Sequence, residues 1–379
     1  MPATFDAVVI GAGGFGSAVT YHLAKSGLRT LALDQFPIAH DHGSSHGETR
    51  AIRKAYFEHP DYVPALHRAY ELWKDLEEIS GEKLYEEVGI LLSGLPDGHV
   101  IKGARLSARL HGIRIDEVTG DAANRFPGFR FPTGHEVLFE PEAGFLYVEY
   151  CIRAHARQAL IAGAEIRTGE SVVNWASNGT TVTVTTTAGV YQAASLVVTA
   201  GAWSSSLLNI PVPLQILRKP VSWFPVRNSA AYNKAQGSPV FLYELPEGIF
   251  YGFPCLDGHE VKVAEHSGGD AVGEPSELNR NWDVADAHSL VTFVGQVMPD
   301  LDPTPVRGSI CMYTMTPDQH FVIDRHPLAR NVVYAAGFSG HGFKFASSLG
   351  EALADMALDR QPRIPLEFLA AGKRFVPAS

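Results

Sequence analysis

Cysteine is scarce in this sequence of 379 residues, which contains only three, Cys151, Cys255 and Cys311. So small and odd a number does not form a disulfide framework, and it is typical of a protein in a reducing compartment. Positive charge is also in short supply, because 31 lysines and arginines face 41 aspartates and glutamates, for a formal net charge of -10. A protein with this balance repels polyanions, so we expect no nucleic-acid partner.

Long apolar runs are missing too, and none approaches the ~20 residues of a membrane-spanning helix. Residues 1–6 carry no cationic segment that would begin a signal peptide. The last residues, Pro377, Ala378 and Ser379, do not match the Ser-Lys-Leu peroxisomal signal. We therefore expect a cytoplasmic protein with no membrane partner. The length, with 45% hydrophobic and 19% charged residues, is typical of a globular protein of two domains.

The N-terminus has the pattern of a dinucleotide-binding βαβ unit. An apolar strand runs into a glycine-rich turn, a helix follows, and a second strand ends at Asp34. Gly11 allows the tight turn, Gly13 lets a pyrophosphate approach the helix N-terminus, and Gly16 lets helix and strand pack closely. Asp34 would accept hydrogen bonds from a ribose. The pattern predicts dinucleotide binding without separating FAD from NAD, and a βαβ turn that binds no phosphate is the alternative.

A later segment favours FAD. Residues 194–200 predict a buried strand that ends at Gly201 and Trp203, and an alternating strand at 181–185 precedes it. FAD enzymes of the glutathione-reductase type commonly return to the cofactor late in the chain in this way. Any buried strand before a turn gives a similar pattern, so this segment does not decide alone.

Three further segments have both a functional and a structural interpretation. The loop at 43–53 carries one imidazole and two guanidiniums, and such a charged loop is usually solvated. Lys262 stands alone between valines on a predicted strand, where it faces either solvent or a buried cofactor. Glycines at 337–342 precede a helix, whose free amides could stabilise negative charge on a reduced flavin. A plain turn is the alternative there.

Three motifs together resemble those of one family. They are Gly-Ser-Ser-His-Gly-Glu-Thr-Arg-Ala-Ile-Arg (43–53), Cys-Met-Tyr-Thr-Met-Thr-Pro-Asp (311–318) and Gly-Phe-Ser-Gly-His-Gly-Phe-Lys-Phe (337–345). They are similar to motifs of the FAD-dependent amine oxidases of the monomeric sarcosine oxidase and N-methyltryptophan oxidase type, with L-pipecolate oxidase as a close relative. The resemblance follows the family's order over nearly the whole chain.

The resemblance implies an α/β fold in which a Rossmann-type FAD-binding domain of the glutathione-reductase type is interleaved with an antiparallel-sheet substrate domain. No single cut in the chain would then separate the two domains. The FAD-binding segments would be 1–85, 140–215 and 312–379, and the substrate-domain segments would be 86–139 and 216–311.

The resemblance also implies residues that hold and assist the flavin. Cys311 would carry FAD through a thioether to the 8α-methyl carbon, whereas without its motif it would be interpreted as a small buried hydrophobe. His46 and Arg50 would form a basic pair beside the flavin ring. Lys262 would place a positive charge over the other flavin face, where it favours reduction of dioxygen to superoxide. Further residues implied in cofactor binding are Gln35, Ser44, Ser45, Val173, Gly201, Trp203, Gly337, Gly340, Gly342 and Lys344.

The substrate site follows from the same resemblance. Arg53 and Lys344 would hold the substrate carboxylate, because two cations suit an anion that must be desolvated. Tyr251, His266 and Tyr313 would line the substrate cavity. No metal ion is expected, and the partners would be a small amino acid and dioxygen, bound by a monomer.

The implied reaction is oxidation of a secondary α-amino acid, such as sarcosine or another N-methyl amino acid, to an imine. Dioxygen would become hydrogen peroxide, and water would hydrolyse the imine to an aldehyde and an amine. The substrate stays open, because Ser45 and residues 52–56 look closer to L-pipecolate oxidase, while residues 262–269 look closer to N-methyltryptophan oxidase. The sequence also leaves open a flavin dehydrogenase with a different electron acceptor, against which Lys262 argues, and a non-enzymatic dinucleotide-binding protein.

Overall fold

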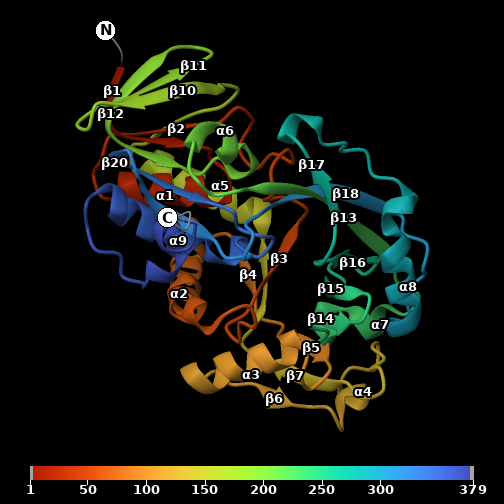
Figure 1. Cartoon of the computed structure of the whole chain (residues 1–379). Helices are drawn as coiled ribbons and strands as arrows, with labels where there is room; N and C mark the ends of the chain where they lie inside the picture. The colour runs from red at the N-terminus through yellow and green to blue at the C-terminus, as the bar shows by residue number, and fades with distance from the viewer. Residues whose placement is uncertain (1–2, 376–379) are drawn as a thin grey trace.

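The computed structural model describes residues 3–375; residues 1–2 and 376–379, at the two ends of the predicted FAD-binding segments, lie outside the described residues. Two large β-sheets that stand side by side organise the chain (Figure 1). The first sheet contains the strand before the glycine-rich turn, and the second is built mainly from the middle of the sequence. Within the described residues, no helix is both long and apolar enough to span a membrane.

The first sheet has eight strands and a parallel centre. β1 pairs in parallel with β2 on one side and β12 on the other, and β12 also pairs in parallel with β20. β10 and β11 form an antiparallel edge next to β12, and β19 pairs antiparallel with β20. The strands are β1 (Ala3–Ile10), β2 (Thr30–Leu33), β9 (Glu165–Arg167), β10 (Val172–Ser177), β11 (Val182–Thr186), β12 (Val190–Val198), β19 (Val322–His326) and β20 (Ala329–Ala336).

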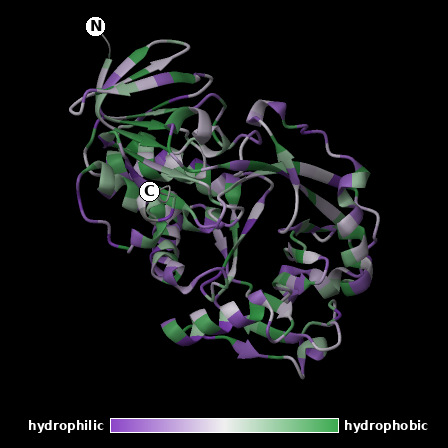
Figure 2. Ribbon diagram, viewed as in Figure 1, coloured by the Kyte–Doolittle hydropathy of each residue, from purple (hydrophilic) through white to green (hydrophobic). Residues whose placement is uncertain are grey.

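Helices pack against this sheet, as a parallel sheet with buried strands requires. α1 packs between α5 and α9, and α2 packs against α9. The contact between α1 and α9 is close because position 350 is glycine, where a Cβ would lie 2.5 Å from the Cβ of Ala18. Apolar residues gather on this sheet and its helices (Figure 2). The helices are α1 (Gly14–Lys25), α2 (Val63–Ser80), α5 (Val148–Ile161) and α9 (Ala346–Ala357).

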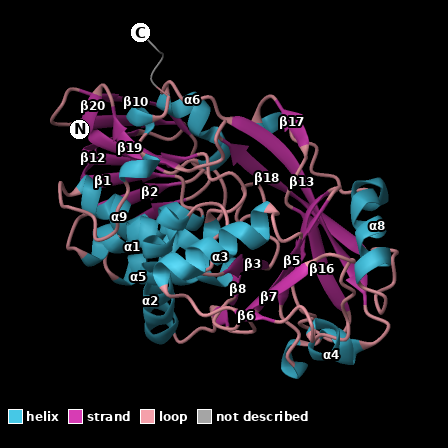
Figure 3. Cartoon of the chain, turned by 60° about the horizontal axis from the view of Figure 1, so that its bottom comes forward, coloured by secondary structure: helices cyan, strands magenta, loops and turns pink. Residues whose placement is uncertain are grey.

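The second sheet has nine strands and is antiparallel except where β14 pairs with β5. β13 is its junction, because it pairs with β16, β17 and β18. α8 lies at the outer side of this sheet (Figure 3). The strands are β5 (Ile90–Gly94), β6 (Asp116–Glu117), β7 (Glu136–Glu140), β13 (Gln215–Pro225), β14 (Val240–Leu245), β15 (Gly248–Gly252), β16 (Glu260–Glu265), β17 (Asp270–Val272) and β18 (Arg307–Met315).

A small third sheet joins the predicted cationic loop to the rest of the molecule. β8 pairs with both β3 and β4, and the three strands are β3 (Thr49–Ile52), β4 (Tyr85–Glu86) and β8 (Gly144–Tyr147). The remaining helices are α3 (His99–His111), α4 (Ala122–Arg125), α6 (Ser204–Leu208), α7 (Ser229–Tyr232) and α8 (His288–Val297).

The two large sheets alternate along the chain. Strands of the first sheet come from residues 3–33, 165–198 and 322–336, and strands of the second come from 90–140, 215–272 and 307–315. The predicted fold class, a Rossmann-type sheet interleaved with an antiparallel sheet, is confirmed. The exact boundaries of the two domains stay a prediction.

Candidate active site

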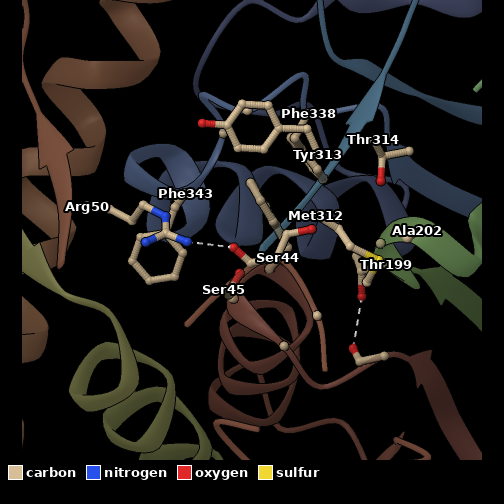
Figure 4. Close-up of a pocket in the computed structure, with 18 of the residues that line it drawn as sticks. Ser44, Ser45, Arg50, Thr199, Ala202, Met312, Tyr313, Thr314, Phe338 and Phe343 are labelled. Atoms are coloured by element: carbon tan, nitrogen blue, oxygen red, sulfur yellow. Dashed lines mark hydrogen bonds between the residues drawn. The ribbon is translucent and has the colours of Figure 1, made fainter. Parts of the chain in front are cut away.

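A cavity of about 270 Å³ lies where the strands of the first sheet end. Its lining includes Gly11 after β1, Asp34 after β2, Thr199 after β12 and Gly337 after β20. Ligands of open parallel sheets bind at this carboxyl edge. The second sheet contributes the facing side chains, among them Tyr313 of β18 (Figure 4).

In the glycine-rich turn, Gly13 has open space beside its Cα, whereas Gly11 is tightly packed against the neighbouring backbone. Gly13 lines the cavity, and a Cβ there would meet nothing within 4 Å. Gly11 has φ +88°, and its Cβ would lie 2.6 Å from the carbonyl oxygen of Thr199. Asp34 is buried and accepts hydrogen bonds from the amides of Ala12 (2.7 Å) and Phe36 (2.9 Å), which leaves carboxylate lone pairs for a ribose. The turn therefore fits a pyrophosphate and an adjoining ribose.

Replacing Gly16 with alanine will abolish binding of the expected FAD. The new Cβ would lie 1.6 Å from the carbonyl oxygen of Gly11, so α1 must move away from the turn that approaches the phosphate. The flavin content of the purified protein, measured from its visible absorbance, is expected to fall to background. Gly295→Ala is the matched control, because a Cβ there meets nothing within 4 Å. A Gly16→Ala protein with the flavin content and melting temperature of the wild type contradicts this role of the turn.

Most residues predicted to contact the cofactor line this cavity. Val173 does not, since its side chain is 63% exposed, whereas its neighbours Ser171 and Val172 do line it. Gly16 packs behind the turn, and Cys311 is buried beside the cavity rather than in its wall. Those in the wall are Gly11, Gly13, Asp34, Gln35, Ser44, Ser45, Gly201, Trp203, Gly337, Gly340, Gly342 and Lys344.

Cys311 lies in a cluster of cations. Its Sγ is 3.5 Å from Nη2 of Arg50 and 4.0 Å from Nδ1 of His46. Burial alone would raise the pKa of this thiol, but the charges of His46, Arg50 and Lys262 outweigh burial and lower it to about 6. The lowered pKa of Cys311 favours its thiolate, which is the nucleophilic form.

Two buried polar atoms near this cluster lack a hydrogen-bond partner among the described residues. They are Nε2 of His46 and Oγ1 of Thr314. Thr314 lines the cavity, and sequence reasoning did not single it out. Unpaired buried polar atoms are costly, so they fit a bound group with hydrogen-bonding atoms, such as a flavin ring.

Lys262 points inward from β16. Its side chain is 4% exposed, so the alternative that it faces solvent is wrong. Its Nζ donates hydrogen bonds to the carbonyl oxygens of Gly47 (2.5 Å) and Thr49 (2.9 Å). Burial, followed by the charge of Arg50, lowers the pKa of Lys262 to about 7. The loop at 43–53 is likewise no solvated face, since it meets Lys262 and Cys311.

Arg53 and Lys344 approach the cavity from two different elements. Nη2 of Arg53 donates to both carboxylate oxygens of Glu58, at 2.7 and 2.8 Å, and its guanidinium stacks over the Phe57 ring. Nζ of Lys344 donates to the carbonyl oxygen of His341 at 2.7 Å. Burial alone would raise the pKa of Glu58, but Arg53, His341 and Lys344 lower it to about 2. Sequence reasoning missed Glu58, which lies outside every motif.

Aromatic rings complete the wall. The ring centres of Tyr251 and His266 are 6.5 Å apart, and those of His266 and Tyr313 are 5.7 Å apart. Burial lowers the pKa of His266 to about 4, so its imidazole is neutral at physiological pH. The structure thus brings all five predicted substrate residues, Arg53, Lys344, Tyr251, His266 and Tyr313, to the same cavity.

A parallel sheet with this glycine-rich turn defines a dinucleotide-binding protein. The unpaired hydroxyl of Thr314 and the cations in the wall of the same cavity suit a flavin oxidoreductase. The model of one family, described as FAD dependent oxidoreductase, matches residues 6–356. The chain belongs to this family. FAD is therefore the cofactor rather than NAD, and the family match favours an enzyme over a non-enzymatic dinucleotide-binding protein.

Several known proteins are similar over most of their length. Monomeric sarcosine oxidase of Bacillus sp. (strain B-0618) is 40% identical over 366 residues, covering 94% of this chain and 93% of the relative. N-methyl-L-tryptophan oxidase of Yersinia pestis (strain Pestoides F) is 33% identical and covers 96% and 97%. Among solved structures, NikD, an amino acid oxidase essential for nikkomycin biosynthesis, aligns with a TM-score of 0.85 at 25% identity, covering 97% of each chain.

Proposed function

We propose that this enzyme oxidises a small secondary α-amino acid, with sarcosine or another N-methyl amino acid as substrate. Amino acid, dioxygen and water would give an aldehyde, an amine and hydrogen peroxide. The observation that carries this proposal is that Arg53 and Lys344 reach the same cavity and that Arg53 already pairs with a carboxylate, Glu58. Among the described residues the ammonium of Lys344 makes no ion pair, which suits one substrate carboxylate.

FAD, when bound, supplies the acceptor for the two electrons of the amine and passes them to dioxygen. The glycine-rich turn and Asp34 would hold its nucleotide half. Ser44, Ser45, Arg50 and Gly342 would also contact the cofactor, because all four line the cavity. These roles are supported by the lining of the cavity and by the resemblance of the three motifs.

The chain's own residues orient the substrate in this proposal. Arg53 and Lys344 fix the carboxylate, which places the α-amine against the wall formed by Tyr251, His266 and Tyr313. The neutral imidazole of His266 can accept a hydrogen bond from an N–H of the amine. The cations Arg53 and Lys344 in the same cavity would favour the neutral amine over its ammonium form. The buried site holds these groups in one geometry, which supplies much of the rate through orientation.

We further propose that Cys311 forms a thioether to the 8α-methyl carbon of FAD. Its lowered pKa and its position between His46 and Arg50 support a nucleophilic thiolate. As the C–S bond forms, the methyl carbon would lose a hydrogen as a proton, and the two electrons would pass through the flavin to dioxygen. Cys311→Ala is expected to release all of its flavin into the supernatant on acid precipitation, whereas the wild-type pellet stays yellow. Cys255→Ala is the matched control, since Cys255 is also buried and free. A wild-type pellet without colour contradicts the covalent link.

Carboxylate binding should weaken as the pH rises above about 7. Burial and the charge of Arg53 lower the pKa of Lys344 to about 7, so Lys344 is charged below that pH and neutral above it. The Kd of propionate, a carboxylate without an amine, is expected to rise up to about tenfold per pH unit above neutrality. Flavin absorbance changes would report binding. In Lys344→Met the Kd should be high at every pH, and a pH dependence that persists in this variant contradicts the assignment.

A panel of substrates tests the proposal itself. Sarcosine, N-methyl-L-tryptophan, L-pipecolate and L-proline would be compared by the peroxide each produces. Peroxide with an N-methyl amino acid supports the proposal, peroxide only with L-pipecolate favours the cyclic alternative, and reduction without peroxide favours a dehydrogenase. A cytoplasmic location is proposed as well, because three free cysteines fit a reducing compartment. A monomer is also proposed, and light scattering of the purified protein tests it.

A further inference from the structure

A second cavity, of about 250 Å³, lies across β3 from the first. Thr49 lines the second cavity, and the next residues on the strand, Arg50 and Ala51, line the first. Among the described residues, no side chain lines both. The strand and the loop before it therefore separate two spaces, and the mechanism proposed above uses only the first.

The inner end of this second cavity is Lys262. Its Nζ lies 4.7 Å from the centre of the Phe253 ring and is held by the carbonyl oxygens of Gly47 and Thr49. Pro254 and Leu256 extend the apolar wall outward from Phe253. A small apolar molecule in this space would thus reach Lys262, the cation to which the resemblance to the amine oxidases assigns a role in dioxygen reduction.

The outer rim is a network of charged and aromatic side chains. Arg307 pairs with Glu260 and with Glu48 (2.9 Å), and its guanidinium stacks 3.9 Å from the centre of the Trp223 ring. Trp223 donates a hydrogen bond from Nε1 to Glu48 at 3.2 Å. These contacts hold the side chains of the rim in one arrangement.

Glu48 is held in a strained conformation at this rim. Its φ is +72°, a left-handed conformation that is unfavourable for a residue with a side chain. Its amide is fixed by the carboxylate of Glu149. Strain of this kind persists only where the surrounding contacts maintain it, and here it aims the Glu48 carboxylate at Arg307 and Trp223.

We propose that this second cavity is the route by which dioxygen reaches Lys262, apart from the route of the amino acid. The inference rests on the proposed role of Lys262. The lining holds two cations, Lys262 and Arg307, against the three acids Glu48, Asp257 and Glu260, so it gives a substrate carboxylate no net attraction. Dioxygen is neutral and apolar and partitions into the space beside Phe253 and Leu256. Hydrogen peroxide, also neutral, can leave the same way.

Xenon tests the cavity directly, because it occupies small apolar spaces in proteins. A crystal of the FAD-loaded enzyme under xenon pressure is expected to hold a xenon atom between Leu256 and Lys262. In Leu256→Trp the indole fills this space, and the xenon should be gone. A wild-type crystal with no xenon in the second cavity overturns the proposal, whether or not the variant folds.

Stopped-flow kinetics test the route. Reoxidation of the reduced enzyme by dioxygen is expected to slow about tenfold in Leu256→Trp, while anaerobic reduction by the amino acid stays unchanged. Val306→Trp is the matched control, because Val306 adjoins Arg307 but is 61% exposed and does not line the cavity. Unchanged reoxidation in Leu256→Trp overturns the route alone. A wild-type enzyme that the amino acid reduces but dioxygen does not reoxidise instead overturns the proposed oxidase function.

Discussion

Lys262→Met will slow the reoxidation of the reduced enzyme by dioxygen at least about 100-fold, the usual loss when one preorganised charge is removed. Methionine keeps the length and packing of the lysine stem but has no charge and no donor for the carbonyl oxygens of Gly47 and Thr49. Reduction by the amino acid should change far less, because Arg53 and Lys344 hold the substrate elsewhere. Stopped-flow absorbance separates the two half-reactions.

A matched lysine controls for the loss of an ammonium group as such. Lys234 pairs with Glu86 at 2.6 Å and lines neither cavity. Lys234→Met is expected to leave both half-reactions unchanged. If Lys262→Met slows reduction and reoxidation equally, Lys262 serves the structure of the site rather than the reaction with dioxygen.

Removing Arg53 will weaken binding of the amino acid about 100-fold, which corresponds to about 3 kcal/mol for a buried charge-assisted pair. Arg53→Met alone would leave Glu58 buried without its partner, which destabilises the fold for a separate reason. The informative variant is therefore Arg53→Met combined with Glu58→Gln. Its Kd for the substrate, taken from the concentration dependence of anaerobic flavin reduction, should rise. The limiting rate of reduction should fall by a smaller factor than the Kd rises.

The control for this double variant is a similar ion pair outside the cavity. Arg68 donates to both carboxylate oxygens of Glu351, at 2.8 and 2.7 Å, and neither residue lines the cavity. Arg68→Met combined with Glu351→Gln should leave the Kd unchanged. Equal affinity in the two double variants would mean that Arg53 does not bind the carboxylate.

Local sequence was sufficient for the parts of the fold that local geometry determines. The strand expected to end at Asp34 is β2, and the helix expected after the glycines at 337–342 is α9. Gly16 could be assigned because any side chain there collides with the backbone of Gly11, a constraint that acts over five residues. Steric constraints between residues that are close in sequence fix the residue types at those positions, so they can be recognised from the sequence.

Long-range contacts could not be derived in the same way. Cys311 meets Arg50 and His46 across more than 260 positions of sequence, and only the resemblance of whole motifs predicted that approach. Glu58 was missed because its importance comes from its ion pair with Arg53 and its proximity to His341 and Lys344, which no motif encodes. The resemblance implied Val173 rather than Val172, although only the folded edge strand β10 decides which of the two faces the cavity.

Anaerobic mixing of the purified FAD-loaded enzyme with an N-methyl amino acid tests the central claim most directly. We expect that sarcosine or N-methyl-L-tryptophan bleaches the visible flavin absorbance, that an aldehyde forms, and that air restores the colour with release of hydrogen peroxide. A flavin that stays oxidised in the presence of sarcosine, N-methyl-L-tryptophan, L-pipecolate and L-proline alike would contradict the claim.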